Sequence, residues 1–171
     1  ISAISFQDLE ETLTRIQIEK ESPLLLLLDQ ITDVRNLGAI LRTAECTGVD
    51  AVVIPSHGSA PINADAIKTS AGAAFNIPIC KVEQVLDALF LIQGMGVKAI
   101  AVTEKSKIPI YDIDLTGPTA LIMGSEGKGI SNKVLKQADA EGSLPILGSI
   151  ESLNVSVACG AVLYETVRQR M

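Results

Sequence analysis

The chain has 171 residues, of which 47% are apolar and 20% charged, a composition typical of one globular domain. Its formal net charge of −6 argues against a dominant nucleic-acid-binding surface, which needs clustered Lys and Arg. The longest uninterrupted apolar run, residues 24–28, is far too short to span a membrane, and no basic, apolar leader is visible. A single histidine and scattered cysteines provide no zinc ligand set, so we expect no metal.

Apolar strands alternate with amphipathic helices along the chain. Strands are predicted at residues 24–28, 50–54, 77–80, 98–102, 119–123 and 144–147. Helices are predicted at residues 6–21, 37–47, 63–71, 82–93, 131–138 and 155–170. Because helices separate strands that are apolar throughout, the pattern predicts an α/β fold with a mostly parallel sheet and helices on both faces.

The spacing of the cysteines fits a reducing compartment, and the single histidine gives no sign of a catalytic base. Cys46, Cys80 and Cys159 are odd in number, widely spaced and set in apolar stretches, which indicates buried free thiols in the cytoplasm. His57 lies between Pro55 and Gly58, so we expect a loop residue rather than a catalytic base.

Three segments with unusual chemistry follow predicted strands, where ligands bind in open α/β sheets. In the first, residues 29–42, Asn36 stands at a predicted helix start and its amide is expected to cap the helix. Arg42 lies within an otherwise apolar helix. Because burying an unpaired guanidinium is costly, Arg42 either reaches solvent at the helix edge or faces an anion in a cleft.

The second segment, residues 123–131, is rich in glycine, which permits close approach of a ligand. Its glycines at positions 124, 127 and 129 fit neither the phosphate-loop pattern nor the dinucleotide-binding pattern, and a solvated turn is the alternative. The third segment, residues 144–158, places Ser152 and Asn154 at the start of the last helix, where an N-cap alone would also explain them.

Together, in this order and spacing, the segments resemble the three signature motifs of the SpoU (TrmH-type) family of RNA ribose 2′-O-methyltransferases, in the SPOUT class. Asn36, Gly38 and Arg42 match the first motif, residues 123–127 the second and residues 152–158 the third. Residues 70–73 are also similar, and the resemblance extends from Leu24 to Arg170. It points most to the branch that methylates bacterial ribosomal RNA, although transfer-RNA enzymes share these motifs.

The resemblance implies a parallel α/β sheet with a C-terminal trefoil knot, S-adenosylmethionine as cofactor, RNA as substrate, and a homodimer whose active sites are completed across the interface. It implies cofactor binding by Thr103, Gly124, Leu144, Ile146 and Leu153. It implies that Arg42 is catalytic and that four further residues orient it and the ribose; these are Asn36, Glu126, Ser152 and Asn154.

The role of Arg42 has two interpretations. Similar enzymes assign to this arginine the removal of the proton from the ribose 2′-hydroxyl. Because an arginine side chain has a pKa above about 12, a clamp on the neighbouring phosphate that stabilises developing negative charge is an equal alternative.

The organisation expected is a linker with a helix over residues 1–22 and the methyltransferase domain over 23–171. The start at Ile1 suggests that an upstream RNA-binding domain is absent from this chain, which would account for its acidity. Five basic residues either form a local patch or are scattered: Arg35, Arg42, Lys105, Lys107 and Lys128. The alternatives are a catalytically idle RNA-binding or cofactor-sensing module on the same fold, and an unrelated nucleotide-binding domain, which the failed phosphate-loop patterns oppose.

Overall fold

The computed structural model describes residues 4–171, so residues 1–3 of the predicted linker lie outside the described residues. Within the described part, six parallel strands form one sheet in the order β3-β2-β1-β5-β4-β6. The strands are β1 (Leu24–Asp29), β2 (Ala51–Pro55), β3 (Ile79–Val82), β4 (Lys98–Val102), β5 (Thr119–Gly124) and β6 (Ala140–Gly142). The predicted parallel α/β sheet is confirmed.

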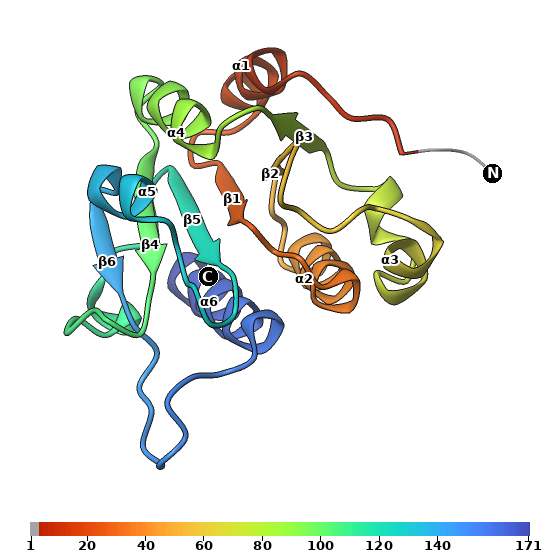
Figure 1. Ribbon diagram of the computed structural model, residues 1–171. Helices are drawn as coiled ribbons and strands as arrows, with labels where there is room; N and C mark the ends of the chain where they lie inside the picture. The colour runs from red at the N-terminus through yellow and green to blue at the C-terminus, as the bar shows by residue number, and fades with distance from the viewer. Residues whose placement is uncertain (1–3) are drawn as a thin grey trace.

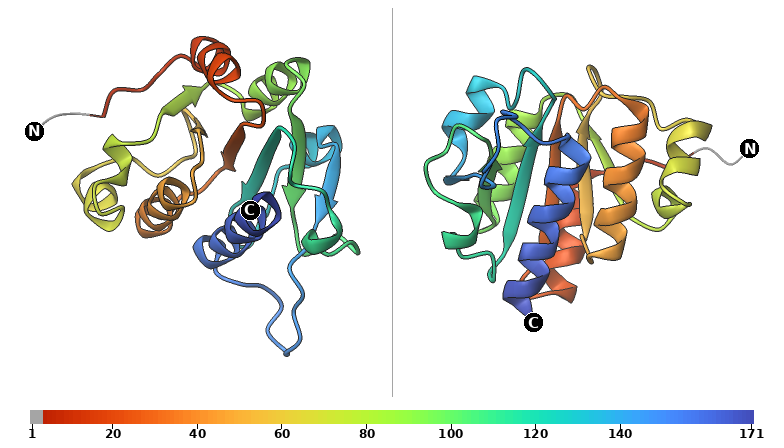
Figure 2. Two further views of the ribbon diagram at one scale, coloured as in Figure 1. Left: turned by 180° about the vertical axis from the view of Figure 1, so that it is seen from behind. Right: turned by 90° about the horizontal axis from the view of Figure 1, so that it is seen from below.

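Helices cover both faces of the sheet (Figure 1). They are α1 (Leu9–Glu19), α2 (Val34–Cys46), α3 (Ala64–Thr69), α4 (Val85–Gly94), α5 (Asn132–Gln137) and α6 (Val155–Arg170), with short 3-10 turns η1 (Ala73–Phe75) and η2 (Ile110–Asp112). Helices α2, α3 and α6 lie on one face, and α1, α4 and α5 on the other. The right-hand view of Figure 2 shows α2 and α6 lying alongside each other on their face.

Strand β1 supplies both hydrophobic cores although it consists almost entirely of leucine. Leu24, Leu26 and Leu28 pack beneath α2 and α6, whereas Leu25 and Leu27 pack against the opposite helices. All five side chains are at most 2% exposed. Since fully burying a leucine contributes about 1.5–3 kcal/mol relative to leaving it exposed, this central strand anchors the three layers.

The prediction of a strand at residues 144–147 is wrong. Strand β6 lies earlier, at Ala140–Gly142, and residues 144–147 form an irregular segment in which Leu147 is 96% exposed. Pro145 has no N–H to donate to a strand ladder. Leu144 packs against the core, whereas Ile146 and Leu147 after the proline are exposed. The other predicted elements are present; β4 and α6 have the predicted ends, and the rest are shifted by a few residues. Helix α1, for example, begins at Leu9 because Asp8 caps it by accepting a hydrogen bond from Glu11 N at 3.0 Å.

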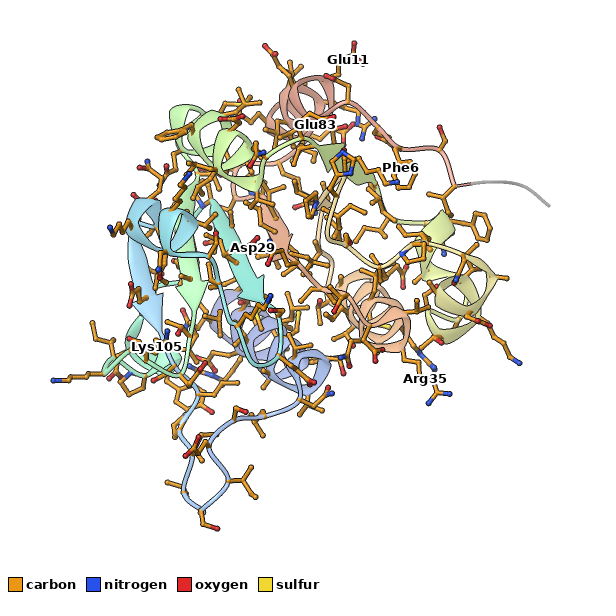
Figure 3. The ribbon with its side chains drawn as sticks, in the orientation of Figure 1. Phe6, Glu11, Asp29, Arg35, Glu83 and Lys105 are labelled. Atoms are coloured by element: carbon orange, nitrogen blue, oxygen red, sulfur yellow. The ribbon has the colours of Figure 1, made fainter. Side chains whose placement is uncertain are left out.

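All strands of a parallel sheet end at the same edge, so the segments that follow the strands lie together there. Asp29, at the end of β1, is paired in register with Gly124 at the end of β5. Val102, at the end of β4, is paired with Gly142 of β6. Asp29 lies in the middle of the molecule in Figure 3 and is only 5% exposed. The carboxyl edge of the sheet therefore positions the candidate site.

Arg170 joins the end of α6 to two distant segments. Its guanidinium donates to the carbonyl oxygens of Ser22 at 2.9 Å, Leu115 at 2.9 Å and Gly117 at 2.7 Å. These carbonyls precede β1 and β5, so the side chain satisfies backbone groups at the amino ends of the two central strands.

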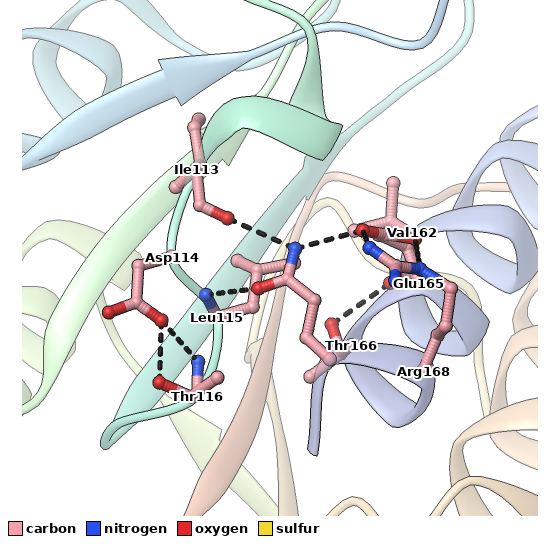
Figure 4. Close-up of polar contacts among 9 residues, drawn as sticks. Ile113, Asp114, Leu115, Thr116, Val162, Glu165, Thr166 and Arg168 are labelled. Atoms are coloured by element: carbon pink, nitrogen blue, oxygen red, sulfur yellow. Dashed lines mark hydrogen bonds and ion pairs between the residues drawn. The ribbon is translucent and has the colours of Figure 1, made fainter. Parts of the chain in front are cut away.

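A second cluster on α6 surrounds Glu165 (Figure 4). Both nitrogens of Arg168 that face Glu165 donate to its carboxylate at 2.8 Å, and Gln169 Nε2 donates at 2.9 Å. Gln169 also accepts from Leu115 N at 2.8 Å and donates to Ile113 O at 3.1 Å. The hydrogen bonds from Arg168, and to a smaller extent the one from Gln169, lower the pKa of Glu165 to about 2.

We expect Arg170→Ala to lower the free energy of unfolding by about 2–4 kcal/mol, because three backbone carbonyls lose a charged donor. Urea denaturation measures this change. Arg35→Ala, at an exposed position, is the matched control and is expected to cost less than about 0.5 kcal/mol. Equal losses in the two variants would contradict the role given to Arg170.

Glu165 predicts a pH dependence of stability. Its folded pKa of about 2 lies below the ordinary unfolded value of about 4.3, so its contribution is complete above about pH 5 and is lost as the pH falls towards 2. Denaturation of the natural chain and of Glu165→Gln between pH 6 and 2.5 tests this. The variant should lose less stability on acidification, and parallel curves would contradict the assignment.

Candidate functional site

A cavity of about 290 Å³ opens at the carboxyl ends of β4 and β5, near the lower end of the size range of small-molecule sites. The loop after β5, the segment 144–153 and the start of α6 complete its walls. All five residues predicted to bind the cofactor line it, namely Thr103, Gly124, Leu144, Ile146 and Leu153. The irregular segment that replaces the expected strand thus forms one wall of the cavity.

Gly124 allows the loop after β5 to fold back over the strand end. A Cβ atom at this position would lie 2.2 Å from the carbonyl carbon of Gly129 and 2.3 Å from Ile130 N. Gly129 N donates to Ser125 O at 2.8 Å and closes the loop, and Ser131 N donates to the buried carboxylate of Asp29 at 2.8 Å. No side chain fits at position 124, and the glycines of this motif are explained by close backbone packing.

Glu126, Asn154 and Asn36 form one polar cluster beside the cavity. Asn154 Nδ2 donates to Glu126 Oε1 at 2.9 Å and to Asn36 Oδ1 at 3.1 Å. The same Glu126 oxygen accepts from Val155 N at 3.1 Å. Asn154 Oδ1 accepts from Ser156 N and Val157 N, so this residue is the N-cap of α6, as expected. The structure therefore joins one residue from each of the three motifs.

The prediction that Asn36 caps its helix is wrong. Helix α2 begins three residues earlier than predicted, at Val34, and Asp33 is its cap, accepting from Arg35 N at 2.8 Å and Asn36 N at 3.0 Å. An aspartate one turn upstream is an equally good cap, and it occupies the helix N–H groups first. The amide of Asn36 is consequently free to bind Asn154.

Ser152 and Arg42 lie outside this cluster. Ser152 lines the cavity and is exposed. Arg42 is exposed on α2 and is not among the residues that line the cavity. Within residues 4–171 its side chain forms no ion pair. Of the two placements considered for Arg42, the structure shows the solvent-exposed one.

Sequence reasoning gave no role to three residues that line the cavity. The hydroxyl oxygen of Ser125 is buried and has no hydrogen-bond partner among the residues described. Glu104, directly after β4, and Glu151, before the third motif, add carboxylates to the walls. The only sequence signal was their position next to motif residues or strand ends.

The remaining residues that the sequence analysis considered do not gather at the cavity. All five basic residues considered as a patch are exposed, but they come from α2 and from two separate loops, with Arg35 and Lys105 well apart in Figure 3. Cys80 and Cys159 are buried free thiols as expected, whereas Cys46 is exposed on α2. His57 is an exposed loop residue beside a second cleft.

No group of three or more His, Cys, Asp or Glu within residues 4–171 is arranged to hold a metal ion. No helix in this part of the chain combines the length and the apolar character that a membrane crossing requires.

The model of the SpoU rRNA Methylase family matches residues 23–164. The chain belongs to this family. It is 42% identical over 161 residues to 23S rRNA (guanosine-2'-O-)-methyltransferase RlmB of Photorhabdus laumondii, covering 94% of the chain and 66% of the relative. RlmB of Pseudomonas aeruginosa is 44% identical over 162 residues, with coverage of 95% and 64%. The chain thus spans just under two thirds of the length of these relatives.

Solved structures of the family share the fold. The SpoU methyltransferase AviRb from Streptomyces viridochromogenes, in complex with AdoMet, has a TM-score of 0.83 at 32% identity, covering 92% of this chain and 64% of AviRb. The AdoMet-bound rRNA methyltransferase from Sinorhizobium meliloti has a TM-score of 0.86 at 25% identity, with coverage of 98% and 62%. The C-terminal trefoil knot is implied by this fold family.

We expect Asn154→Ala to lower the free energy of unfolding by about 1–2 kcal/mol, because α6 loses its cap. Asn36→Ala removes only the exposed hydrogen bond to Asn154 and should cost less than about 1 kcal/mol. Urea denaturation of both single variants and the double variant measures these values. If the Asn154→Ala variant were as stable as the natural chain, the stabilising role given to Asn154 would be wrong.

Proposed function

We propose that the chain catalyses S-adenosylmethionine-dependent methylation of a ribose 2′-hydroxyl in RNA, with ribosomal RNA as substrate. The observation that carries this proposal is the single cavity around which the second and third motifs gather, next to the Asn36–Glu126–Asn154 cluster. The relatives named as 23S rRNA (guanosine-2'-O-)-methyltransferases and the AdoMet bound to two structures of the family support it.

The cavity suits this cofactor chemically. Leu144, Ile146 and Leu153 offer apolar surface to an adenine ring, while the unpartnered hydroxyl of Ser125 and the loop backbone beside Gly124 offer hydrogen bonds. When bound, S-adenosylmethionine supplies a methyl group on a sulfonium centre. Thr103 closes the cavity at the end of β4, where its hydroxyl accepts from Lys105 N at 3.3 Å.

We propose that Arg42 clamps an RNA phosphate rather than acting as the base. The ribose hydroxyl must lose its proton as it attacks, and a guanidinium stabilises the negative charge that develops. Its exposed position on α2 suits contact with RNA, because it presents an unpaired cation to solvent within residues 4–171. Asn36, Glu126 and Asn154 form the polar cluster beside the cavity, and we assign binding of the ribose to Ser152, which lines the cavity.

A homodimer is part of the proposal. Four exposed apolar side chains lie on the segment before α6 and on α6 itself: Leu147 (96% exposed), Ile150 (75%), Val157 (57%) and Tyr164 (56%). Exposed apolar surface of this kind is characteristic of an interface, and a twofold contact would place these side chains against their counterparts. Light scattering of the purified chain measures its mass in solution.

Transfer RNA is the second candidate substrate. The A. aeolicus TrmH/SpoU tRNA modifying enzyme has a TM-score of 0.80 at 31% identity, covering 95% of this chain and 84% of that enzyme. The higher identity to RlmB relatives, 42–44%, favours ribosomal RNA.

Residues 23–171 are proposed as the methyltransferase domain, since the family match begins at residue 23. A cytoplasmic location follows from ribosomal RNA as substrate and agrees with three free cysteines.

Transfer of a labelled methyl group from S-adenosylmethionine to ribosomal RNA tests the proposal. Arg42→Ala should lower the rate at least about 100-fold, because the stabilisation of developing charge is lost. Its cofactor affinity should remain within about twofold, since Arg42 does not line the cavity.

Lys68→Ala, a charge removal at an exposed position of α3, serves as the control and should leave the rate unchanged. Full activity of Arg42→Ala would overturn the role of Arg42. Cofactor binding without transfer to either ribosomal or transfer RNA would favour an idle module on the same fold.

A further inference from the structure

The cavity carries charge of one sign only. Glu104, Glu126 and Glu151 line it, whereas no lysine, arginine or histidine is among its lining residues. In the part of the chain that the structure describes, none of the three forms an ion pair. Glu126 is engaged through Oε1 with Asn154 and Val155, but Glu104 and Glu151 are exposed at the cavity wall.

The buried hydroxyl of Ser125 is an independent sign that this acidic cavity is completed by a ligand. Its oxygen is inaccessible and has no hydrogen-bond partner among residues 4–171, yet Ser125 is part of the cavity wall. Buried polar atoms are nearly always hydrogen-bonded, so we infer that this side chain rotates towards the cavity and binds a ligand there.

We propose that Glu104 and Glu151 select the cationic cofactor over its demethylated product. The inference rests on the proposed function and concerns the same cavity. Methyl transfer breaks the bond from sulfonium sulfur to methyl carbon and forms a bond from the ribose oxygen to that carbon. The sulfur keeps the electron pair as a neutral thioether, and the hydroxyl proton is released. The ligand therefore loses one positive charge within a cavity lined by carboxylates.

The expected size of this selection follows from Coulomb's law. A unit charge several ångströms from an exposed carboxylate, screened by solvent, gains affinity of about three- to tenfold per glutamate at low salt. A neutral zwitterion such as S-adenosylhomocysteine gains far less from the same carboxylates. Selection of this kind weakens retention of the product after the reaction.

A different role for the two carboxylates makes a different prediction. If Glu104 or Glu151 accepted hydrogen bonds from the ribose hydroxyls of the cofactor, it would strengthen binding of cofactor and product equally, because both carry the same ribose. Comparison of charged and neutral ligands on the same variants separates the two roles.

The test is calorimetric titration of the whole chain with three ligands at about 20 mM and about 200 mM salt. S-adenosylmethionine and sinefungin, in which an amine-bearing carbon replaces the sulfonium, are cationic; S-adenosylhomocysteine is not. The variants are Glu104→Gln, Glu151→Gln and the double variant. Glu83→Gln is the matched control, since it removes one exposed carboxylate from the second cleft, beside β3 and α4 in Figure 3.

We expect the natural chain to bind both cationic ligands more tightly than the product, with the preference reduced at the higher salt. The double variant should lower the ratio of affinities by about tenfold or more while leaving product binding unchanged, and Glu83→Gln should alter the ratio less than about twofold. An equal loss for all three ligands, or an unchanged ratio in folded variants, would overturn the selection but leave the methyltransferase proposal intact. Absence of binding of every ligand by the folded natural chain would overturn both.

Discussion

The structure of the site depends on one carboxylate oxygen. Glu126 Oε1 accepts hydrogen bonds from Asn154 Nδ2 at 2.9 Å and from Val155 N at 3.1 Å, while Asn154 reaches Asn36 at 3.1 Å. These bonds connect the start of α2, the loop after β5 and the start of α6, and Asn36 and Asn154 are 118 positions apart in sequence. A charged acceptor at a helix start also interacts favourably with the helix dipole. The cluster therefore fixes the geometry of α6 relative to the cavity.

The sheet provides the rigid support for this cluster. Strand β1 lies at the centre, buried on both faces, and β5 beside it ends at Gly124. Asp29 holds the far end of the loop after β5 through Ser131 N, and the absence of a side chain at Gly124 lets that loop lie against the strand. Arg170 and Gln169 secure the other end of α6 to the segments before β1 and β5. Helix α6 is thus tied at both ends, and its start faces the cavity.

The sequence predicted the layers well because burial on both faces leaves a local pattern. The predicted strand at residues 98–102 and the last helix at residues 155–170 agree with the structure at both ends. The sequence does not predict strand β6, because Ala140–Gly142 lacks the apolar run on which strand prediction relies. The apolar residues 144–147 after it resemble a buried strand more closely. In the structure, Leu144 and Ile146 line the cavity and Leu147 is exposed.

The site was predictable in its motifs but not in its contacts. Gly124, Leu144, Ile146 and Leu153, to which the resemblance assigns cofactor binding, line one cavity. The cap of α2, the bond between Asn36 and Asn154, and the cavity lining by Glu104 and Glu151 depend on which loops meet in space. The local hydrophobic pattern of a sequence carries no information on contacts between distant loops, so only the folded chain shows them. The acidic balance of the sequence argued against nucleic acid, yet part of it lies in a cavity where it suits a cationic ligand.

The most direct test of the central claim is calorimetric titration of the natural chain with S-adenosylmethionine. The arrangement of the motifs around one cavity predicts saturable binding of one ligand per chain. A folded chain that binds no S-adenosylmethionine at millimolar concentration would contradict the assignment of this cavity and, with it, the methyltransferase function.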